Sequence, residues 1–319
     1  MTTLHVSRAV PPRPAEAKPP RLHGALLRIE RKLQPWRAPL GWIAFAGVLG
    51  WLLLQLRAIG WSSLRAALPT SPTFYALVVA AYLVLPLADT AIYRGLWRTR
   101  AVATFRICLR KRIYNSVLIG YSGEVALLLW ARERVGRSAA ELAHAIKDVN
   151  VLSAAVSTYG AAALICWLAT RVALDRLPDA ALIWWGAATI ALAAVSPLLF
   201  IRRGGVLAMP LREGAPVLAV HAVRFVLGLL LVLAQWRVAL PGTGWTALVA
   251  LLAVQVLVGR LPLVPNRDVL FAGVALSMSG TLAMKEASLA GVLVVTSVLQ
   301  QALHLLTFAA TEAAGATPR

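Results

Sequence analysis

Glu124 is a carboxylate placed where an apolar segment begins. It ends the turn Gly120-Tyr121-Ser122-Gly123-Glu124 and precedes the uncharged run Val125 to Ala131, with basic residues on both sides. A carboxylate at a helix N-terminus gains about 0.3–1 kcal/mol from the helix dipole, whereas an acid inside a membrane costs about 2.5–3.5 kcal/mol. Helix capping does not cover that cost. We therefore expect Glu124 to contact a cationic group or to exchange a proton.

Three arginines could bind phosphate, because a guanidinium group matches two phosphate oxygens. Arg224 lies within an apolar run, where the alternative role is an ion pair with Asp89 or Glu124. Arg260 and Arg267 flank a proline-rich motif, and the alternative for both is the ordinary bias of positive charge toward one membrane face.

Asp268 is a second acid at the start of a short apolar segment. Aligning Glu124 with Asp268 superposes seven identical pairs: Val125/Val269, Ala131/Ala275, Gly136/Gly280, Ala139/Ala283, Ala143/Ala287, Val151/Val295 and Ser153/Ser297. Both halves run in the order turn, acid, short helix, glycine, long span. Transporters are often built from such repeats, with interrupted segments marking the binding site. The pattern predicts an internal repeat, while the alternative for Asp268 is a solvated turn.

The composition indicates an integral membrane protein. The 319 residues are 59% hydrophobic and only 14% charged, with a mean hydropathy of +0.73, whereas soluble domains carry about 25% charged residues. The net charge of +19 would suggest nucleic acid on a soluble domain. Here the basic residues lie between apolar runs, which favours anionic lipid headgroups as partners and no nucleic acid.

Apolar runs of about 17–25 residues can cross a bilayer. The expected spans are 39–56, 73–95, 149–170, 180–201, 216–236, 244–260 and 288–310, and the short segments are 113–131 and 268–284. The fold class expected is all-α, a polytopic bundle of about 7–8 spans with one or two re-entrant hairpins. Residues 1–38 form a basic, proline-rich tail, 39–312 the membrane domain and 313–319 a short tail.

Loop charges orient the chain, because Lys and Arg concentrate in cytoplasmic loops. Eight precede the first span, seven lie in the predicted loop 94–112, and Arg132, Arg134, Arg137 and Lys147 follow the segment 113–131. Both ends of this segment are therefore expected inside, as in a re-entrant hairpin that bends at Gly120, Ser122 and Gly123. We interpret Arg110-Lys111-Arg112 as a topogenic, lipid-facing cluster. The charges do not fix the side of 261–284 or of the C-terminus.

Nothing in the sequence indicates catalysis. It contains no nucleophile elbow, P-loop or metalloprotease motif, so we expect no catalytic residue and no cofactor. Cys108, expected in the basic loop, and Cys166, expected in a span, predict no disulfide, and five scattered histidines predict no metal site. Asp89, Gln255 and His304 are interpreted as polar groups that hydrogen-bond between helices.

Two motifs resemble the lysylphosphatidylglycerol synthase transmembrane family, whose members have flippase-like domains. The first is Tyr114-Asn115-Ser116 followed by Ser122-Gly123-Glu124, Arg132 and Gly136, and the second is Arg260-Leu261-Pro262-Leu263-Val264-Pro265-Asn266-Arg267-Asp268. The resemblance covers about 40–310, although the second acid is Asp268 where the family usually has Glu. It implies substrate-binding roles for Asn115, Gly123, Glu124, Arg260, Arg267 and Asp268, and the position of Arg224 within an apolar run gives it the same expected role.

The resemblance implies a flippase in the bacterial inner membrane that moves an anionic phospholipid or a lipid-linked intermediate between leaflets. The loop charges place its N-terminus in the cytoplasm. A different class of function stays open: an accessory subunit that organises a membrane-bound lipid- or glycan-modifying enzyme. A membrane glycosyltransferase is less favoured, since no loop carries an acidic cluster for a metal and a sugar nucleotide.

Overall fold

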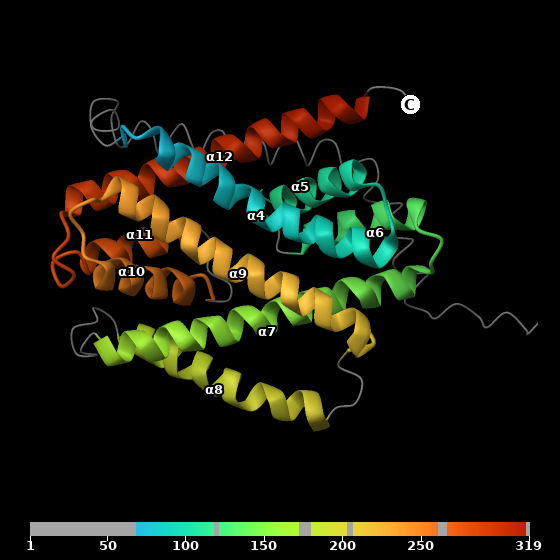
Figure 1. Cartoon of the computed structure of the whole chain (residues 1–319), viewed down its shortest axis with the longest axis horizontal. Helices are drawn as coiled ribbons and strands as arrows, with labels where there is room; N and C mark the ends of the chain where they lie inside the picture. Colours follow the sequence, from blue (N-terminus) through green and yellow to red (C-terminus); the bar gives the residue numbers. More distant parts are fainter. Residues whose placement is uncertain (1–67, 118–120, 172–179, 203–206, 261–266, 317–319) are drawn as a thin grey trace, which may run out of the picture. The chain divides into compact units, whose positions relative to one another are not determined.

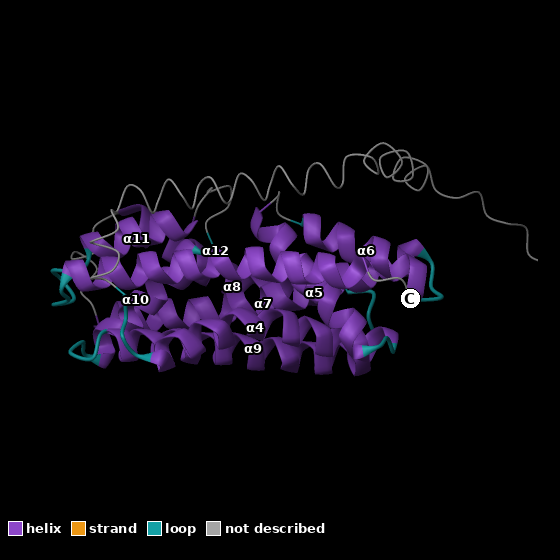
Figure 2. Cartoon of the chain, turned by 90° about the horizontal axis from the view of Figure 1, so that it is seen from above, coloured by secondary structure: helices purple, strands orange, loops and turns teal. Residues whose placement is uncertain are grey.

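The computed structural model describes residues 68–117, 121–171, 180–202, 207–260 and 267–316, all within one unit of the chain, Val48–Arg319. The predicted tail 1–38 and the predicted first span 39–56 lie outside these residues. Every regular element in the described ranges is an α-helix, as Figure 2 shows. The all-α prediction is confirmed.

Nine helices lie in the described ranges. They are α4 (Pro72–Trp97), α5 (Ala101–Val117), α6 (Ser122–Arg134), α7 (Ala139–Arg171), α8 (Ala180–Arg202), α9 (Leu211–Ala239), α10 (Trp245–Val258), α11 (Arg267–Ser277) and α12 (Glu286–Ala316).

Four of these helices are long and apolar enough to cross a membrane: α4, α7, α9 and the part of α12 from Ser288 to Ala313. They correspond to the predicted spans 73–95, 149–170, 216–236 and 288–310. The apolar part found in α8 is the shorter Gly186–Ser196. The 14 residues of α10 extend only about 21 Å, less than the hydrocarbon thickness of about 30 Å. The chain is a multi-pass membrane protein.

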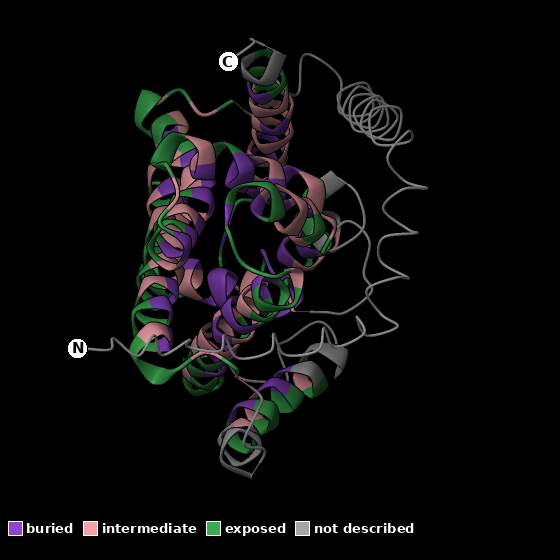
Figure 3. Ribbon diagram, turned by 90° about the vertical axis from the view of Figure 1, so that its right-hand side faces the viewer, coloured by how far each residue is buried: buried purple, intermediate pink, exposed green. Residues whose placement is uncertain are grey.

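The outer face of α9 shows why a bilayer is needed. Its most apolar window has a mean hydropathy of 2.4, yet only 11% of that window is buried inside the protein. Large apolar side chains on this face are exposed, namely Leu218, Val223, Val226, Leu227 and Leu230. An apolar helix that leaves this much surface uncovered by protein is suited to contact with lipid chains. Figure 3 shows such exposed positions interleaved with buried ones along the helices.

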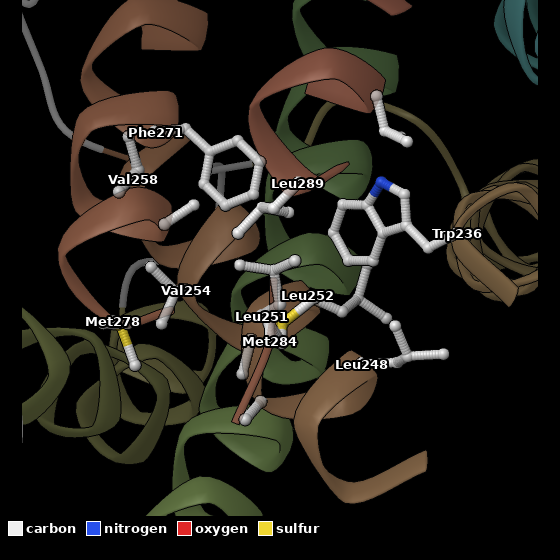
Figure 4. Packing of buried hydrophobic residues seen from close by; sticks show 14 of the residues in the cluster. Trp236, Leu248, Leu251, Leu252, Val254, Val258, Phe271, Met278, Met284 and Leu289 are labelled. Carbon is white, nitrogen blue, oxygen red and sulfur yellow. The ribbon is translucent and has the colours of Figure 1, made fainter. Parts of the chain in front are cut away.

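Packing of the helices forms two apolar cores. One core joins the C-terminal part of α4 with α5, α6 and the start of α7, and includes Tyr93, Leu127 and Leu142. The other is built around α10, α11 and the adjoining parts of α9 and α12. There the rings of Trp236 and Phe271 stack with centroids 6.1 Å apart (Figure 4).

Neighbouring helices define how the two cores connect. Helix α4 packs along α9 and α9 packs along α7, while α5 packs against α4, α6 and α12. Helix α10 packs against α7, α9 and α11, and α12 packs against α11 and α4. Figure 1 shows α4 and α9 side by side and running in opposite directions.

The N-terminus of α7 is fixed by a reciprocal cap. The Glu141 backbone N–H donates to Ser138 Oγ at 3.3 Å, and the Ser138 N–H donates to Glu141 Oε2 at 2.8 Å. This Ser-x-x-Glu pairing satisfies two N–H groups that would otherwise lack partners at a helix start. It separates the short helix α6 from the long α7.

The predicted loop 94–112 is wrong for most of its length. Helix α4 ends where Arg98 adopts a left-handed conformation with φ 52°, and α5 begins only three residues later at Ala101. Cys108 and the three basic residues after it therefore lie on a helix. The physical reason is a buried stripe at helical spacing, formed by Thr104, Cys108 and Lys111, which the high density of basic residues obscures in the sequence.

Candidate functional site

A charged cluster lies buried where α4, α5 and α6 meet. Lys111 Nζ of α5 lies 2.8 Å from Asp89 Oδ2 of α4 and 3.5 Å from Glu124 Oε1 of α6. The side chains of Lys111, Asp89 and Glu124 are 8%, 4% and 13% exposed. A lone buried charge of either sign would be very costly. Here one ammonium group is shared by two carboxylates, which leaves one negative charge in excess within the cluster.

The turn between α5 and α6 positions Glu124. Asn115 Oδ1 accepts a hydrogen bond from the Gly123 N–H at 2.7 Å, and Asn115 Nδ2 donates to Glu124 Oε2 at 2.9 Å. Ser122 Oγ donates to the Tyr114 carbonyl at 2.8 Å. The structure thus brings together three of the predicted site residues, Asn115, Gly123 and Glu124. Asn115 holds the first turn of α6 and the carboxylate together.

Gly123 allows α6 to lie close to α5. A Cβ atom at this position would collide with the Lys111 carbonyl oxygen and with Asn115 Oδ1. Any other residue would push the two helices apart, and the contact between Lys111 and Glu124 depends on their closeness. The predicted bend residue is therefore a packing requirement of the cluster.

Two arginines lie beside this cluster. Arg224 Nη2 of α9 donates to Ser153 Oγ of α7 at 2.9 Å. The guanidinium carbon of Arg112 lies 4.4 Å from the centroid of the Tyr82 ring. Asp89 is near enough to interact electrostatically with both arginines. The predicted direct ion pair of Arg224 with Asp89 or Glu124 is not formed, because both carboxylates bind Lys111 instead.

Arg112 also touches a polar network that reaches α12. The Tyr82 hydroxyl lies 3.0 Å from His304 Nδ1 and 2.9 Å from Thr307 Oγ1. This confirms the expected role of His304 in hydrogen bonding between helices. The network ties α4 and α12 together next to Arg112.

The remaining predicted residues lie in other places. Arg260, in the turn after α10, donates from Nη1 to Thr158 Oγ1 of α7 at 2.7 Å. Asp268 is exposed in the first turn of α11, and α11 packs against α10 and α12. Arg267 is the first residue of α11, and its side chain lies outside the described part of the chain. Neither Arg260 nor Asp268 joins the cluster around Lys111.

Sequence reasoning missed the roles of Lys111 and Arg112. Three successive basic residues on a helix point in directions about 100° apart, so they reach different neighbours. Arg110 bonds Glu312 at 3.0 Å, Lys111 bonds Asp89, and Arg112 lies over Tyr82. The signal in the sequence was the helical spacing of Thr104, Cys108 and Lys111 on α5, together with the acid Asp89 in a neighbouring span.

An apolar cavity that is largely open to the outside of the bundle lies between α7, α9 and α10. It measures about 480 Å³ and is lined by residues that include Val156, Gly160, Trp167, Phe225 and Val249. The Phe225 ring lies directly on Gly160, where a Cβ atom would collide with it.

The described residues contain no group of three or more His, Cys, Asp or Glu side chains arranged to hold a metal ion. Comparisons of the chain with protein-family models, with curated proteins and with solved structures find no match. The resemblance to the lysylphosphatidylglycerol synthase transmembrane family stays a prediction from its two motifs.

Proposed function

We propose that this protein moves an anionic phospholipid, or a lipid-linked intermediate, between the two leaflets of the bacterial inner membrane. The observation that carries the proposal is the Asp89–Lys111–Glu124 cluster, buried within a bundle of apolar helices. Ionisable groups inside a membrane are expensive, and they commonly mark the path of a substrate or a proton. A polar centre of this kind suits a lipid headgroup that crosses the bilayer while its acyl chains stay in lipid.

The short helices support this function. The 13 residues of α6 and the 11 residues of α11 are too few to cross a bilayer. Each packs against the helix before it, α5 or α10, and each is followed by a long apolar helix. We interpret α5–α6 and α10–α11 as two re-entrant hairpins. Broken helices of this kind form substrate sites at the midplane of many transporters.

Helix packing supports an internal repeat. The four helices α4 to α7 correspond in order to the four helices α9 to α12. Helices that pack against each other in the first set have counterparts that pack against each other in the second. The α4–α5, α5–α6 and α6–α7 contacts have counterparts in α9–α10, α10–α11 and α11–α12, and the contacts of α12 with α4 and α5 have counterparts in those of α7 with α9 and α10. Helix α8 links the two sets.

The repeat is of the inverted kind. Gln235 Nε2, near the end of α9, donates to the Leu77 carbonyl near the start of α4 at 3.2 Å, so these counterpart helices are antiparallel (Figure 1). A two-fold axis that exchanges antiparallel spans lies in the membrane plane, which is the arrangement of many secondary transporters. One hairpin then opens toward the cytoplasm and the other toward the opposite side.

The two contacts of Lys111 suggest how Glu124 takes part in transport. Its contact with Glu124, at 3.5 Å, is longer than its contact with Asp89, at 2.8 Å. In the proposed cycle a proton takes the place of Lys111 at Glu124, and Lys111 stays paired with Asp89. The energy would come from the proton potential or from a lipid gradient.

The test is leaflet exchange of fluorescent phosphatidylglycerol in vesicles that contain the purified protein. We expect Glu124→Gln to slow exchange by about tenfold or more, because removing a charge from a transport site costs at least about 1.4 kcal/mol of barrier. The matched control is Glu133→Gln on the same helix, whose side chain is 73% exposed. An inactive wild type would contradict transport and favour the accessory-subunit function. Unchanged exchange by Glu124→Gln would remove this residue from the mechanism.

A further inference from the structure

The buried charges beside α9 do not balance. Within the described part of the chain, three cations, Lys111, Arg112 and Arg224, lie near two carboxylates, Asp89 and Glu124. One positive charge is in excess, and protonation of His221 or His304 would only add to it. Uncompensated charge in a low-dielectric interior is strongly unfavourable, so the site is complete only with one further negative charge.

The two arginines carry this excess. Both Arg112 Nε and Arg224 Nε are buried and have no hydrogen-bond partner among the described residues. The two guanidinium groups are also close enough to repel each other. Arg112 is held by the face of Tyr82 and Arg224 by the neutral Ser153. Each guanidinium group therefore keeps a donor for an acceptor that the described chain does not supply.

We propose that Arg112 and Arg224 together bind the phosphodiester group of a phospholipid. A phosphodiester carries one negative charge, which matches the excess, and its two non-bridging oxygens offer one acceptor to each arginine. Guanidinium groups are suited to such oxyanions. The inference rests on the proposed function, because it names the group that the same buried centre would hold during transport.

The apolar cavity argues for a lipid rather than a free anion. Arg224 and Phe225 are adjacent on α9, and Phe225 lines the cavity. Ser153, which bonds Arg224, lies one turn before Val156 of the same cavity on α7. One molecule can therefore place its phosphate between the arginines and one acyl chain in the cavity.

The experiment measures equilibrium binding of radiolabelled phosphatidylglycerol to the purified full-length protein in detergent. We expect Arg112→Gln and Arg224→Gln each to weaken binding by about tenfold or more, which is about 1.4 kcal/mol, since each removes a charge-assisted hydrogen bond to the phosphate. The matched control is Arg110→Gln, because Arg110 lies on α5 but pairs with Glu312; its affinity should equal that of the wild type. Equal affinity in all three variants would overturn the proposal.

Competition identifies the chemistry of the ligand. Unlabelled phosphatidylglycerol should displace the probe much better than inorganic phosphate, glycerophosphoglycerol, diacylglycerol or oleate. Phosphate or glycerophosphoglycerol competing equally well would overturn the assignment to a lipid. If oleate competes equally well, the protein recognises an anionic lipid and not specifically a phosphodiester. If diacylglycerol competes equally well, the negative charge of the ligand plays no role in binding.

A second pair of variants guards against misfolding. Arg112→Lys and Arg224→Lys keep the positive charge but remove the Nε donor. We expect both variants to fold and to bind phosphatidylglycerol more weakly, and wild-type affinity in both would contradict the proposal.

Binding is also separable from transport. A protein that binds phosphatidylglycerol through these arginines without moving it contradicts the proposed function alone, whereas transport without dependence on Arg112 or Arg224 contradicts this inference alone.

Discussion

Lys111 is the residue on which the buried centre depends. Among the charged groups of the described residues, Lys111 is the one that lies within 4 Å of both Asp89 and Glu124. Removing Lys111 leaves each carboxylate without its direct ion-pair partner, and breaking a buried pair in this way costs about 3–5 kcal/mol. The two carboxylates would then also repel each other across the space that Lys111 fills.

We therefore predict that Lys111→Met lowers the free energy of unfolding by about 3–5 kcal/mol, measured by denaturation in mixed micelles. The matched control is Arg106→Met on the same helix. Arg106 is exposed, so its replacement should change stability by less than about 0.5 kcal/mol.

The double variant Asp89→Asn/Lys111→Met tests the same pairing. Because neutralising Asp89 removes one of the stranded carboxylates, it should recover part of the loss caused by Lys111→Met. Strictly additive effects of the two substitutions would show that these residues do not act on each other.

At the scale of elements, the short helix α6 brings Glu124 to Lys111 only if it packs closely against α5. The Asn115 side chain and the bare Cα of Gly123 together set that closeness. Backbone at the start of α6 is also constrained, since Tyr121 has φ 71°, a conformation that costs a non-glycine residue about 1–2 kcal/mol. The hairpin thus holds Glu124 in place against local strain.

We predict that Gly123→Ala destabilises the protein by about 1–3 kcal/mol, the usual cost of overpacking, and that it slows lipid exchange because Glu124 is moved away from Lys111. Gly136→Ala is the control, since a Cβ atom there meets nothing within 4 Å. Both variants are compared by denaturation and by leaflet exchange. Equal effects of the two substitutions would mean that the close approach of α5 and α6 does not matter.

The elements also show what the sequence could predict. Long apolar runs predicted the four candidate spans, because hydropathy over about 20 residues is a strong signal. The turn before Glu124 was predictable from a lone acid in an apolar context after Gly120, Ser122 and Gly123, whereas its contacts with Lys111 and Asn115 were not. Helix α5 was not, since its charged surface hides a stripe of only a few buried residues. The pairing of Asp89 with Lys111 depends on how α4 and α5 pack, which no local pattern specifies.

At the scale of the whole molecule, the proposed inverted repeat determines a topology that loop charges alone could not. If α4 and α9 are counterparts in opposite directions, then the connection after α6 and the connection after α11 lie on opposite sides of the membrane. The basic residues after α6 place the first connection in the cytoplasm. The second connection is then external, and α12 ends in the cytoplasm.

Cysteine labelling in intact bacterial cells tests this topology. Arg137 and Thr281 are exposed residues of the two connections and correspond to each other under the alignment of Glu124 with Asp268. In a Cys166→Ala background, which keeps only the buried Cys108, we predict that a membrane-impermeant maleimide labels Thr281→Cys in intact cells. Arg137→Cys should be labelled only after lysis. Labelling of both positions under the same condition would place the two connections on one side, which would exclude an inverted repeat and with it a pair of hairpins that open to opposite faces.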